Sequence, residues 1–297
     1  MLDFKYWNID RSLQEGETRG DACGLLVPFG DSKLRGFYLT PNHREGEKHP
    51  VVIMFHGFPG ITNNHDLGEA LRRCGFIVVN PYAPGSWGSD GVYTVDGIVN
   101  AAVTVCKYVR SDEFCKANYA DPDRISVFGH SMGGFVVANI MKRLDWIKTG
   151  VLLTPYNVSW YFANDMESGF TDIIDACDFL RTKYGEPCGT EVGRKVLLEN
   201  ARRVWKDLDY SEYAEDLADR NLYFIGADFD TCAQTERMIE PLWVSLQAIK
   251  PDDDASGQSS PAPIRLWENY PTDHGFNDSR LLLCEKVCSW LCSLNRD

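Results

Sequence analysis

Residues 129–133 (GHSMG) combine residue types that suit a nucleophilic serine. They follow the apolar, β-branched run 125–128 and precede a stretch, 134–144, whose apolar residues have helical spacing. On such a tight strand-to-helix turn the hydroxyl of Ser131 would be exposed, and the flanking glycines avoid collisions of a Cβ with neighbouring backbone. We interpret this segment as a nucleophile elbow. The alternative is a glycine-rich turn with an incidental serine.

A serine hydroxyl is a poor nucleophile until a base takes its proton, so the positions of histidine and carboxylate matter. His274 lies in a loop directly after the last expected strand and before the expected terminal helix. Two carboxylates, Asp228 and Asp230, follow the expected strand 222–225. Ser131 would attack a carbonyl carbon, His274 would carry its proton to the leaving group, and an aspartate would orient the imidazole. This chemistry needs no metal or organic cofactor.

The elements that must position these residues follow from hydrophobic periodicity. Continuous apolar runs predict buried strands, and the intervening segments have helical spacing. A turn is expected at 121–124, before the strand that leads to Ser131. This alternation predicts an α/β fold with a doubly wound, mostly parallel sheet. The strands are expected at 51–55, 76–79, 125–128, 151–153, 222–225 and 264–267, and helices at 67–74, 95–109, 134–144 and 281–294.

The alternation stops after Pro155 and returns near residue 221. We expect a core formed by 1–155 and 221–297, with 156–220 as a helical lid or cap inserted over the strand ends. The alternative is a helical decoration remote from the site. A polar loop is expected at 251–261. The inserted segment is rich in aromatic residues, namely Trp160, Tyr161, Phe162, Phe170, Phe179, Tyr184 and Trp205.

Composition excludes several other classes. The 297 residues carry a net charge of −13, which argues against nucleic acid and anionic membrane as partners. The amino terminus has no pattern of a signal peptide, so the ten cysteines are expected to be free thiols of a cytoplasmic protein. Cys284, Cys288 and Cys292 share one helix face, where core packing is favoured over metal ligation. Monomer and homodimer both remain open.

The order serine, acid, histidine resembles that of the α/β-hydrolase superfamily across almost the whole chain. The resemblance implies Asp230 as the acid, because it leads into a helix-like segment, with Asp228 as the alternative. It also implies an oxyanion hole formed by the backbone N–H groups of Met132 and Phe58, the latter in the HGFPG loop 56–60. His56 is expected to tie that loop down, with a role as a catalytic base as the alternative. His130 and His65 are expected to be packing or surface residues.

Within this superfamily the segment 85–91 (GSWGSDG) resembles lidded carboxylesterases of the cinnamoyl/feruloyl-esterase type and serine aminopeptidase-like hydrolases. The resemblance implies a serine esterase for small to medium or aromatic acyl groups. Trp160 of the aromatic-rich inserted segment and Asp90 are candidate substrate-binding residues. A peptidase is the alternative, with Asp90, Asp165 or Glu167 holding a substrate ammonium. A binding protein that has kept the fold without turnover is the third hypothesis.

Overall fold

The structure is a computed structural model that describes residues 2–60, 64–184, 191–249 and 262–295. Its centre is an eight-stranded sheet in the order β1-β2-β4-β3-β5-β6-β7-β8. The first two pairings are antiparallel and the remaining ones are parallel, as expected for a doubly wound sheet. The strands are β1 Ala22–Phe29, β2 Ser32–Leu39, β3 His49–Phe55, β4 Ile77–Pro81, β5 Ala120–His130, β6 Thr149–Leu153, β7 Asn221–Ala227 and β8 Arg265–Tyr270.

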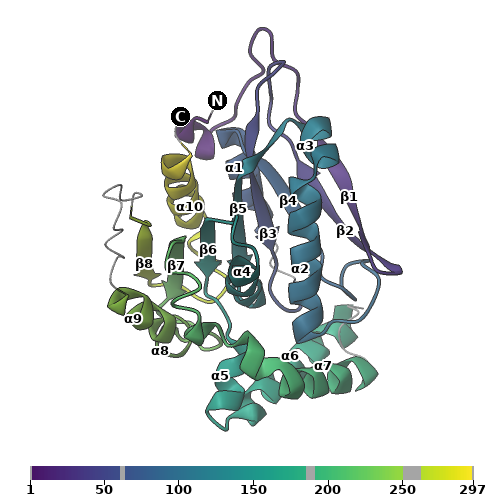
Figure 1. Cartoon of the computed structure of the whole chain (residues 1–297), viewed down its shortest axis with the longest axis vertical. Helices are drawn as coiled ribbons and strands as arrows, with labels where there is room; N and C mark the ends of the chain where they lie inside the picture. Colours follow the sequence, from purple (N-terminus) through teal and green to yellow (C-terminus); the bar gives the residue numbers. More distant parts are fainter. Residues whose placement is uncertain (1, 61–63, 185–190, 250–261, 296–297) are drawn as a thin grey trace, which may run out of the picture.

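Helices cover both faces of this sheet (Figure 1). Alternate residues of β3 belong to two separate apolar clusters, because successive side chains of a strand point to opposite faces. One cluster packs against α1 His65–Cys74 and α10 Arg280–Leu294. The other packs against α2 Val95–Arg110, α3 Asp112–Asn118, α4 Met132–Arg143, α8 Thr235–Met238 and α9 Glu240–Ala248.

The three regularly spaced cysteines of α10, Cys284, Cys288 and Cys292, are buried in the first of these clusters. Their spacing therefore reflects a core-facing stripe, as the sequence predicts. The eight described cysteines are all free. Among the described residues there is no group of three or more His, Cys, Asp or Glu side chains that could hold a metal ion.

The expected turn at 121–124 is wrong, because these residues belong to β5. The strand pairs with β3 through His49 and Ala120, and again through Val51 and Ile125, so its register shifts between the two pairs. The extra residues of β5 form a bulge, in which Arg124 donates to the Asp121 carboxylate at 2.7 Å. A bulge admits Pro122 and extra residues within a strand, whereas their composition alone is typical of a turn.

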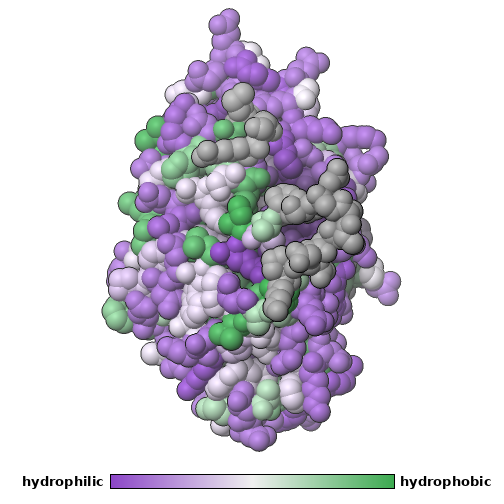
Figure 2. Space-filling view, turned by 60° about the vertical axis from the view of Figure 1, so that its left-hand side comes forward, coloured by the Kyte–Doolittle hydropathy of each residue, from purple (hydrophilic) through white to green (hydrophobic). Residues whose placement is uncertain are grey.

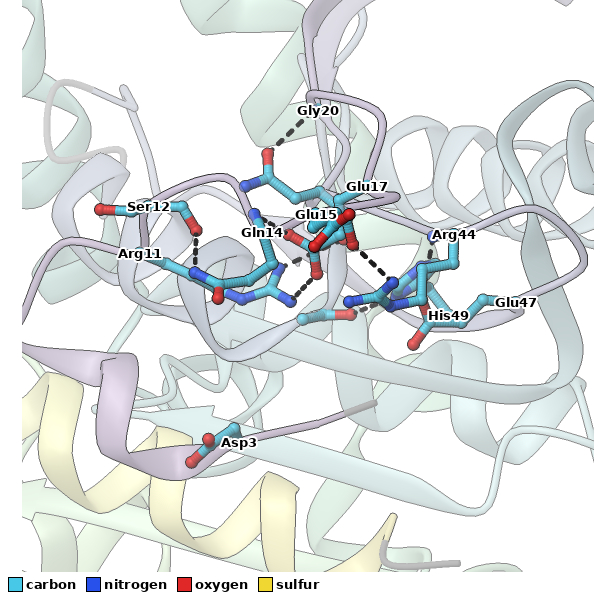
Figure 3. Close-up of polar contacts among 12 residues, drawn as sticks. Asp3, Arg11, Ser12, Gln14, Glu15, Glu17, Gly20, Arg44, Glu47 and His49 are labelled. Carbon is cyan, nitrogen blue, oxygen red and sulfur yellow. Dashed lines mark hydrogen bonds and ion pairs between the residues drawn. The ribbon is translucent and has the colours of Figure 1, made fainter.

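The antiparallel strands β1 and β2 extend the sheet on one side, and the chain before β1 is fastened by polar contacts (Figure 3). Arg11 pairs with Glu17 at 2.6 Å and donates to the carbonyl of Asn42 at 3.2 Å. Arg44 donates to the carbonyl of Glu15 at 2.8 Å. These contacts lie near His49, the first residue of β3. They are therefore at the amino end of that strand.

Residues 156–220, called here the helical insertion, follow β6, and the three α-helices described within them lie at the bottom of Figure 1, beyond the carboxyl end of that strand. The last of these residues return to the amino end of β7, where Lys142 pairs with Asp216 at 3.1 Å and Lys148 pairs with Asp219 at 2.5 Å. The insertion contains α5 Val158–Ala163, α6 Glu167–Tyr184 and α7 Glu191–Val204, and two short 3-10 helices, η3 Trp205–Leu208 and η4 Tyr210–Glu212. The side chains of Phe179 and Tyr184 and the expected loop 251–261 lie outside the described residues.

The insertion is attached to the start of α2 by Asn200 of α7. Its amide oxygen accepts from the N–H groups of Val95 at 2.8 Å and Asp96 at 3.3 Å, and its amide nitrogen donates to the Asp96 carboxylate at 2.7 Å. Thr94 accepts from Gly97 at the same helix end. Together these side chains satisfy amide groups of the first turn of α2 that have no partner within the helix.

The surface toward the edge strand β8 is mainly hydrophilic, with hydrophobic residues in separate spots (Figure 2). Val244, Ile264 and Leu281 are among the exposed hydrophobic residues of the molecule. Scattered exposure of this kind is ordinary for protein surfaces. Within the described part of the chain, no helix combines the length and the apolar character that crossing a membrane requires.

Candidate active site

Ser131 occupies the turn between β5 and α4, where the strand ends and the helix begins at the next residue. Its backbone has φ 57° and ψ −120°, a conformation that residues with a side chain rarely adopt. The N–H of Ser131 donates to the carbonyl of Leu153 at 2.9 Å, and its own carbonyl accepts from Tyr156 at 3.0 Å. The end of β6 therefore holds the strained turn in place.

The glycines of the elbow, residues 129–133, allow a close approach of backbone segments. A Cβ on Gly133 would lie 2.0 Å from the carbonyl oxygen of Phe55 at the end of β3. A Cβ on Gly57, in the loop that follows β3, would lie 3.0 Å from Cβ of Ser131. The loop after β3 is therefore packed directly against the elbow, and larger residues at these two positions would separate them.

His274 lies in the loop between β8 and α10, and its ring meets the carboxylate of Asp230 in the segment after β7. The distance from Nδ1 of His274 to Oδ2 of Asp230 is 2.6 Å. The other carboxylate oxygen of Asp230 accepts from the N–H groups of Cys232 and Ala233, each at 2.8 Å. Asp228, in contrast, is exposed. The structure thus brings Asp230, and not Asp228, to the histidine.

The surroundings of Asp230 favour its charged form. Burial by itself raises the pKa of this carboxyl, but the hydrogen bond from His274, the charge of that ring and the two backbone N–H groups outweigh the burial and leave the pKa below its ordinary value. The side chain of Asp230 is fully buried, whereas that of His274 is 28% exposed. A buried carboxylate beside a partly exposed imidazole can fix the ring orientation and stabilise an imidazolium.

The backbone of His274 is held as well as its ring. Its carbonyl oxygen lies 2.9 Å from Nε2 of His130 and 3.2 Å from the hydroxyl of Thr154. Because a carbonyl oxygen only accepts, His130 must carry its proton on Nε2. Burial lowers the pKa of His130 to about 3, with the charge of His274 as a further cause, so this ring is neutral. His130 was expected to be a packing or surface residue, and it is a buried donor to the His274 loop.

His56 links the loop after β3 to the segment after β4. Its Nε2 accepts from the N–H of Ala83 at 3.0 Å, so Nδ1 carries the proton and donates to the carbonyl of Gly57 at 2.7 Å. Burial lowers its pKa. Both ring nitrogens are engaged with the backbone, in agreement with the expected structural role. Phe58, the expected oxyanion donor, follows Gly57 directly, and His65 is exposed at the start of α1.

Ser131 and His274 open into one cavity of about 340 Å³, called here the outer cavity. Its wall includes Phe58 and Met132, the two residues expected to form an oxyanion hole. The helical insertion supplies a further part of the wall, chiefly with apolar side chains, and the segment after Asp230 completes it. These wall residues are Tyr156, Phe170, Ile173, Ile174, Ala176 and Leu197 of the insertion, Tyr93, and Thr231 and Cys232.

Two expected substrate-binding residues lie elsewhere among the described residues. The ring of Trp160 faces the guanidinium of Arg237 at 4.8 Å and does not line the outer cavity. The carboxylate of Asp90 accepts from the N–H of Lys33 at 2.9 Å, at the turn between β1 and β2. Each side chain serves a local contact that sequence spacing did not reveal, and neither lines the outer cavity.

The acids considered for binding an ammonium group also have other surroundings. Glu167 pairs with Arg202 within the insertion, and Asp165 is exposed. The described lining of the outer cavity contains no Asp or Glu side chain. The tyrosines, Thr231, Cys232, Ser131 and His274 are its polar members.

The chain is similar to known proteins in sequence. Residues 45–154, which include the loop after β3 and the elbow, match the family described as "Putative serine esterase (DUF676)". The chain is 28% identical over 149 residues to the uncharacterized peptidase YuxL of Bacillus subtilis (strain 168). That similarity covers 47% of this chain and 22% of the peptidase, so the chain spans less than a quarter of that relative's length.

Solved structures share the fold over nearly the whole chain. An acylaminoacyl peptidase of Pyrococcus horikoshii has a TM-score of 0.62 at 16% identity, over 93% of this chain and 41% of the peptidase. Est1E of Butyrivibrio proteoclasticus has a TM-score of 0.61 at 18% identity, over 91% of this chain and 98% of Est1E. At such identities the likeness demonstrates the fold alone. The chain therefore has the α/β-hydrolase fold, and in sequence it is similar to a family of putative serine esterases and to a peptidase.

Proposed function

We propose that the protein hydrolyses carboxylic esters through an acyl-enzyme formed on Ser131. His274 takes the proton of the Ser131 hydroxyl during attack on the ester carbonyl and returns it to the departing alkoxide. Asp230 orients the imidazole and stabilises its protonated form. Water then attacks the acyl-enzyme with His274 again as the base, and the acid is released. Every proton in this cycle passes through Nε2 of His274.

The contact of 2.6 Å between His274 and Asp230, beside Ser131 in one cavity, is the observation that carries this proposal. Ser131 and His274 line this cavity and Asp230 holds the His274 ring, which supports an activated serine. The net lowering of the Asp230 pKa supports a carboxylate, and not a carboxylic acid, as the partner of the ring. A strained backbone at Ser131 is also typical of a nucleophile held in position.

We assign the oxyanion hole to the backbone N–H groups of Met132 and Phe58. Met132 is the first residue of α4, so its amide lies at the positive end of the helix dipole. Phe58 follows Gly57, whose backbone lies against Ser131. Two amides from separate segments would then face the carbonyl oxygen of a substrate bonded to Ser131.

We further propose that the helical insertion acts as a lid over the outer cavity and that the substrate is a neutral ester with an apolar acyl group. The insertion contributes Phe170, Ile173, Ile174 and Leu197 to the wall, and the apolar area favours an apolar ligand. Within the described lining no carboxylate is available to bind an ammonium group. An ester is therefore favoured over a peptide with a free amino terminus.

Labelling with a fluorophosphonate tests the mechanism, since such a reagent reacts with an activated serine. The native protein should be labelled, and Ser131→Ala should remove the label while leaving the melting temperature close to that of the native protein. Ser245→Ala, at an exposed serine outside the cavity, should label normally. Absence of labelling in the native protein would favour a binding protein without turnover.

A substrate panel separates ester from amide hydrolysis. Nitrophenyl acyl esters, hydroxycinnamate esters and aminoacyl or acylaminoacyl amides are compared by kcat/KM. The hydroxycinnamates are included because Est1E has been solved with ferulic acid bound. We expect esters of neutral acyl groups to be the better substrates. Turnover of the amides with none of the esters would overturn the ester proposal and favour the peptidase.

A further inference from the structure

A second cavity, called here the inner cavity, lies between the carboxyl ends of β3 and β4 and helix α2. It is small, about 30 Å³, and its wall is formed largely by aliphatic side chains. Its polar members include His56, whose ring nitrogens are both engaged with the backbone. Space of this kind suits additional methylene groups better than polar ligands.

Tyr93 lines both the outer and the inner cavity. It lies just before α2, is only 5% exposed, and packs its ring against Phe58 with 4.9 Å between the ring centroids. Phe58 in turn lines the outer cavity beside Ser131. The Tyr93 ring therefore stands between the space at the nucleophile and the space beneath α2.

Helix α4 gives the direction from one cavity to the other. Met132 lines the outer cavity and Val136 lines the inner one. These residues are four positions apart, so they share one helix face and lie about 6 Å apart along the axis. The inner cavity is thus one helical turn farther from Ser131, on the side where Tyr93 and Phe58 stand.

We propose that Tyr93 is a specificity-determining residue whose ring closes the acyl-binding end of the outer cavity and so limits the length of the acyl chain. This inference rests on the function proposed above. His274 protonates the departing oxygen, so the alcohol lies on the His274 side and the acyl chain lies away from it. The chain then runs along α4 toward Tyr93. Without that ring, the inner cavity becomes a continuation of the acyl site for a straight saturated chain.

The experiment compares nitrophenyl esters of even acyl lengths from acetate to dodecanoate on the native protein, Tyr93→Ala and Tyr93→Phe. Tyr93→Ala should move the preferred acyl length toward longer chains, with kcat/KM gaining about fourfold for each additional buried methylene. Tyr93→Phe keeps the ring and should retain the native length profile. Tyr93→Leu should give a smaller shift in the same direction, and it provides the test if the alanine variant does not fold.

A second substitution checks where the additional methylenes go. Ala102 lines the inner cavity and is 3% exposed. Adding Ala102→Leu to Tyr93→Ala should fill the inner cavity and return the length profile toward the native one. In the native background, where the ring already closes the passage, Ala102→Leu should leave the profile unchanged.

Two results would overturn the role of Tyr93. One is an unchanged acyl-length profile in both Tyr93→Ala and Tyr93→Leu while the acetate ester is still turned over. The other is a shift that appears with alcohols of increasing length at a fixed acetyl group instead of with the acyl series. Neither result affects the proposed hydrolysis itself. That proposal fails separately, if the native protein neither turns over esters nor reacts with a fluorophosphonate.

Discussion

The elbow and the wall supplied by the helical insertion meet at the same cavity but are built differently. At the elbow, backbone lies against backbone, and a Cβ on Gly133 would come within 2.0 Å of the Phe55 carbonyl. The insertion contributes side chains such as Ile173 and Ile174 to the cavity, and other apolar residues of similar size could fill the same space. The difference suggests that position of the reacting groups is fixed by the main chain, whereas selectivity depends on exchangeable side chains.

The largest effect should follow from the carboxylate that orients the histidine. Asp230→Asn removes the charge opposite His274 and should lower kcat by about 10⁴-fold. Asp228→Asn is the matched control, because Asp228 is exposed and the His274 ring is held by Asp230, and it should change kcat little. Steady-state kinetics of the two variants would give the comparison. If Asp228→Asn were the more damaging variant, the assignment of the acid would be wrong.

Gly133→Ala should disrupt the elbow through its backbone contact. Neither the Phe55 carbonyl nor α4 can move without displacing strand or helix, so we expect a loss of about 3 kcal/mol or more in the free energy of unfolding. Gly24→Ala in β1 is the control, since a Cβ there would meet nothing within 4 Å. Urea unfolding measures both variants. Native-like stability of Gly133→Ala would contradict the view that the elbow tolerates no side chain at this position.

His130 makes the free energy of unfolding depend on pH. Its pKa of about 3 in the folded protein lies below the ordinary value of about 6.5, so between these limits the unfolded chain binds a proton that the folded chain does not. The contribution of His130 to the free energy of unfolding is therefore fully present above about pH 6.5. It falls by about 1.4 kcal/mol for each pH unit below that value and levels off near pH 3. In urea unfolding at pH 7, 5 and 4, His130→Phe should reduce the pH slope of the unfolding free energy by this amount, and His49 and His56, whose pKa values burial also lowers, should keep slopes of their own.

A histidine outside the elbow provides the control for that measurement. His65 is exposed at the start of α1, and His65→Gln should retain the slope of the native protein. A slope that stays the same in His130→Phe would mean that His130 does not remain neutral when the protein is folded.

The smallest effect is expected in the insertion. Ile173→Ala removes part of the wall of the outer cavity, and neighbouring apolar side chains can close much of the gap. We expect less than about a tenfold decrease in kcat/KM for long acyl esters, with the rate on acetate esters retained. Asp172→Ala, at an exposed neighbour, should have no effect on either substrate. A large loss on acetate esters would show that the insertion also positions the reacting groups.

Sequence reasoning predicted the central sheet because the strands β3, β4 and β6 are buried throughout and consist largely of apolar residues. It did not predict β1 and β2, which lie toward one side of the sheet and are more exposed, nor the bulge at 121–124. Proline and aspartate in that segment are equally compatible with a turn. Residues 121–124 form part of a strand because β5 pairs with β3, and β3 is far from them in the sequence. Their own residue types do not reveal that pairing.

The candidate site shows the same limit. Ser131 and His274 could be selected from motif and order, but Asp228 and Asp230 could not be separated with certainty, because the choice depends on how the chain turns after β7. The positions of Tyr93 and His130 depend on contacts across the fold. Tyr93 can be recognised only once the structure is known. It is an aromatic residue two positions before α2, and the insertion covers the start of that helix.

Asn200 links the helical insertion to the start of helix α2 in the core. Its amide completes the hydrogen bonding at the start of α2, so swinging the insertion outward would leave the amide groups of Val95 and Asp96 to the solvent. Losing a cap of this kind costs about 1 kcal/mol. Tyr93 lies in the segment that leads into the same helix end, so fraying there would loosen the ring at the end of the cavity. The entry of substrate and the selection of acyl-chain length would then both depend on the start of α2.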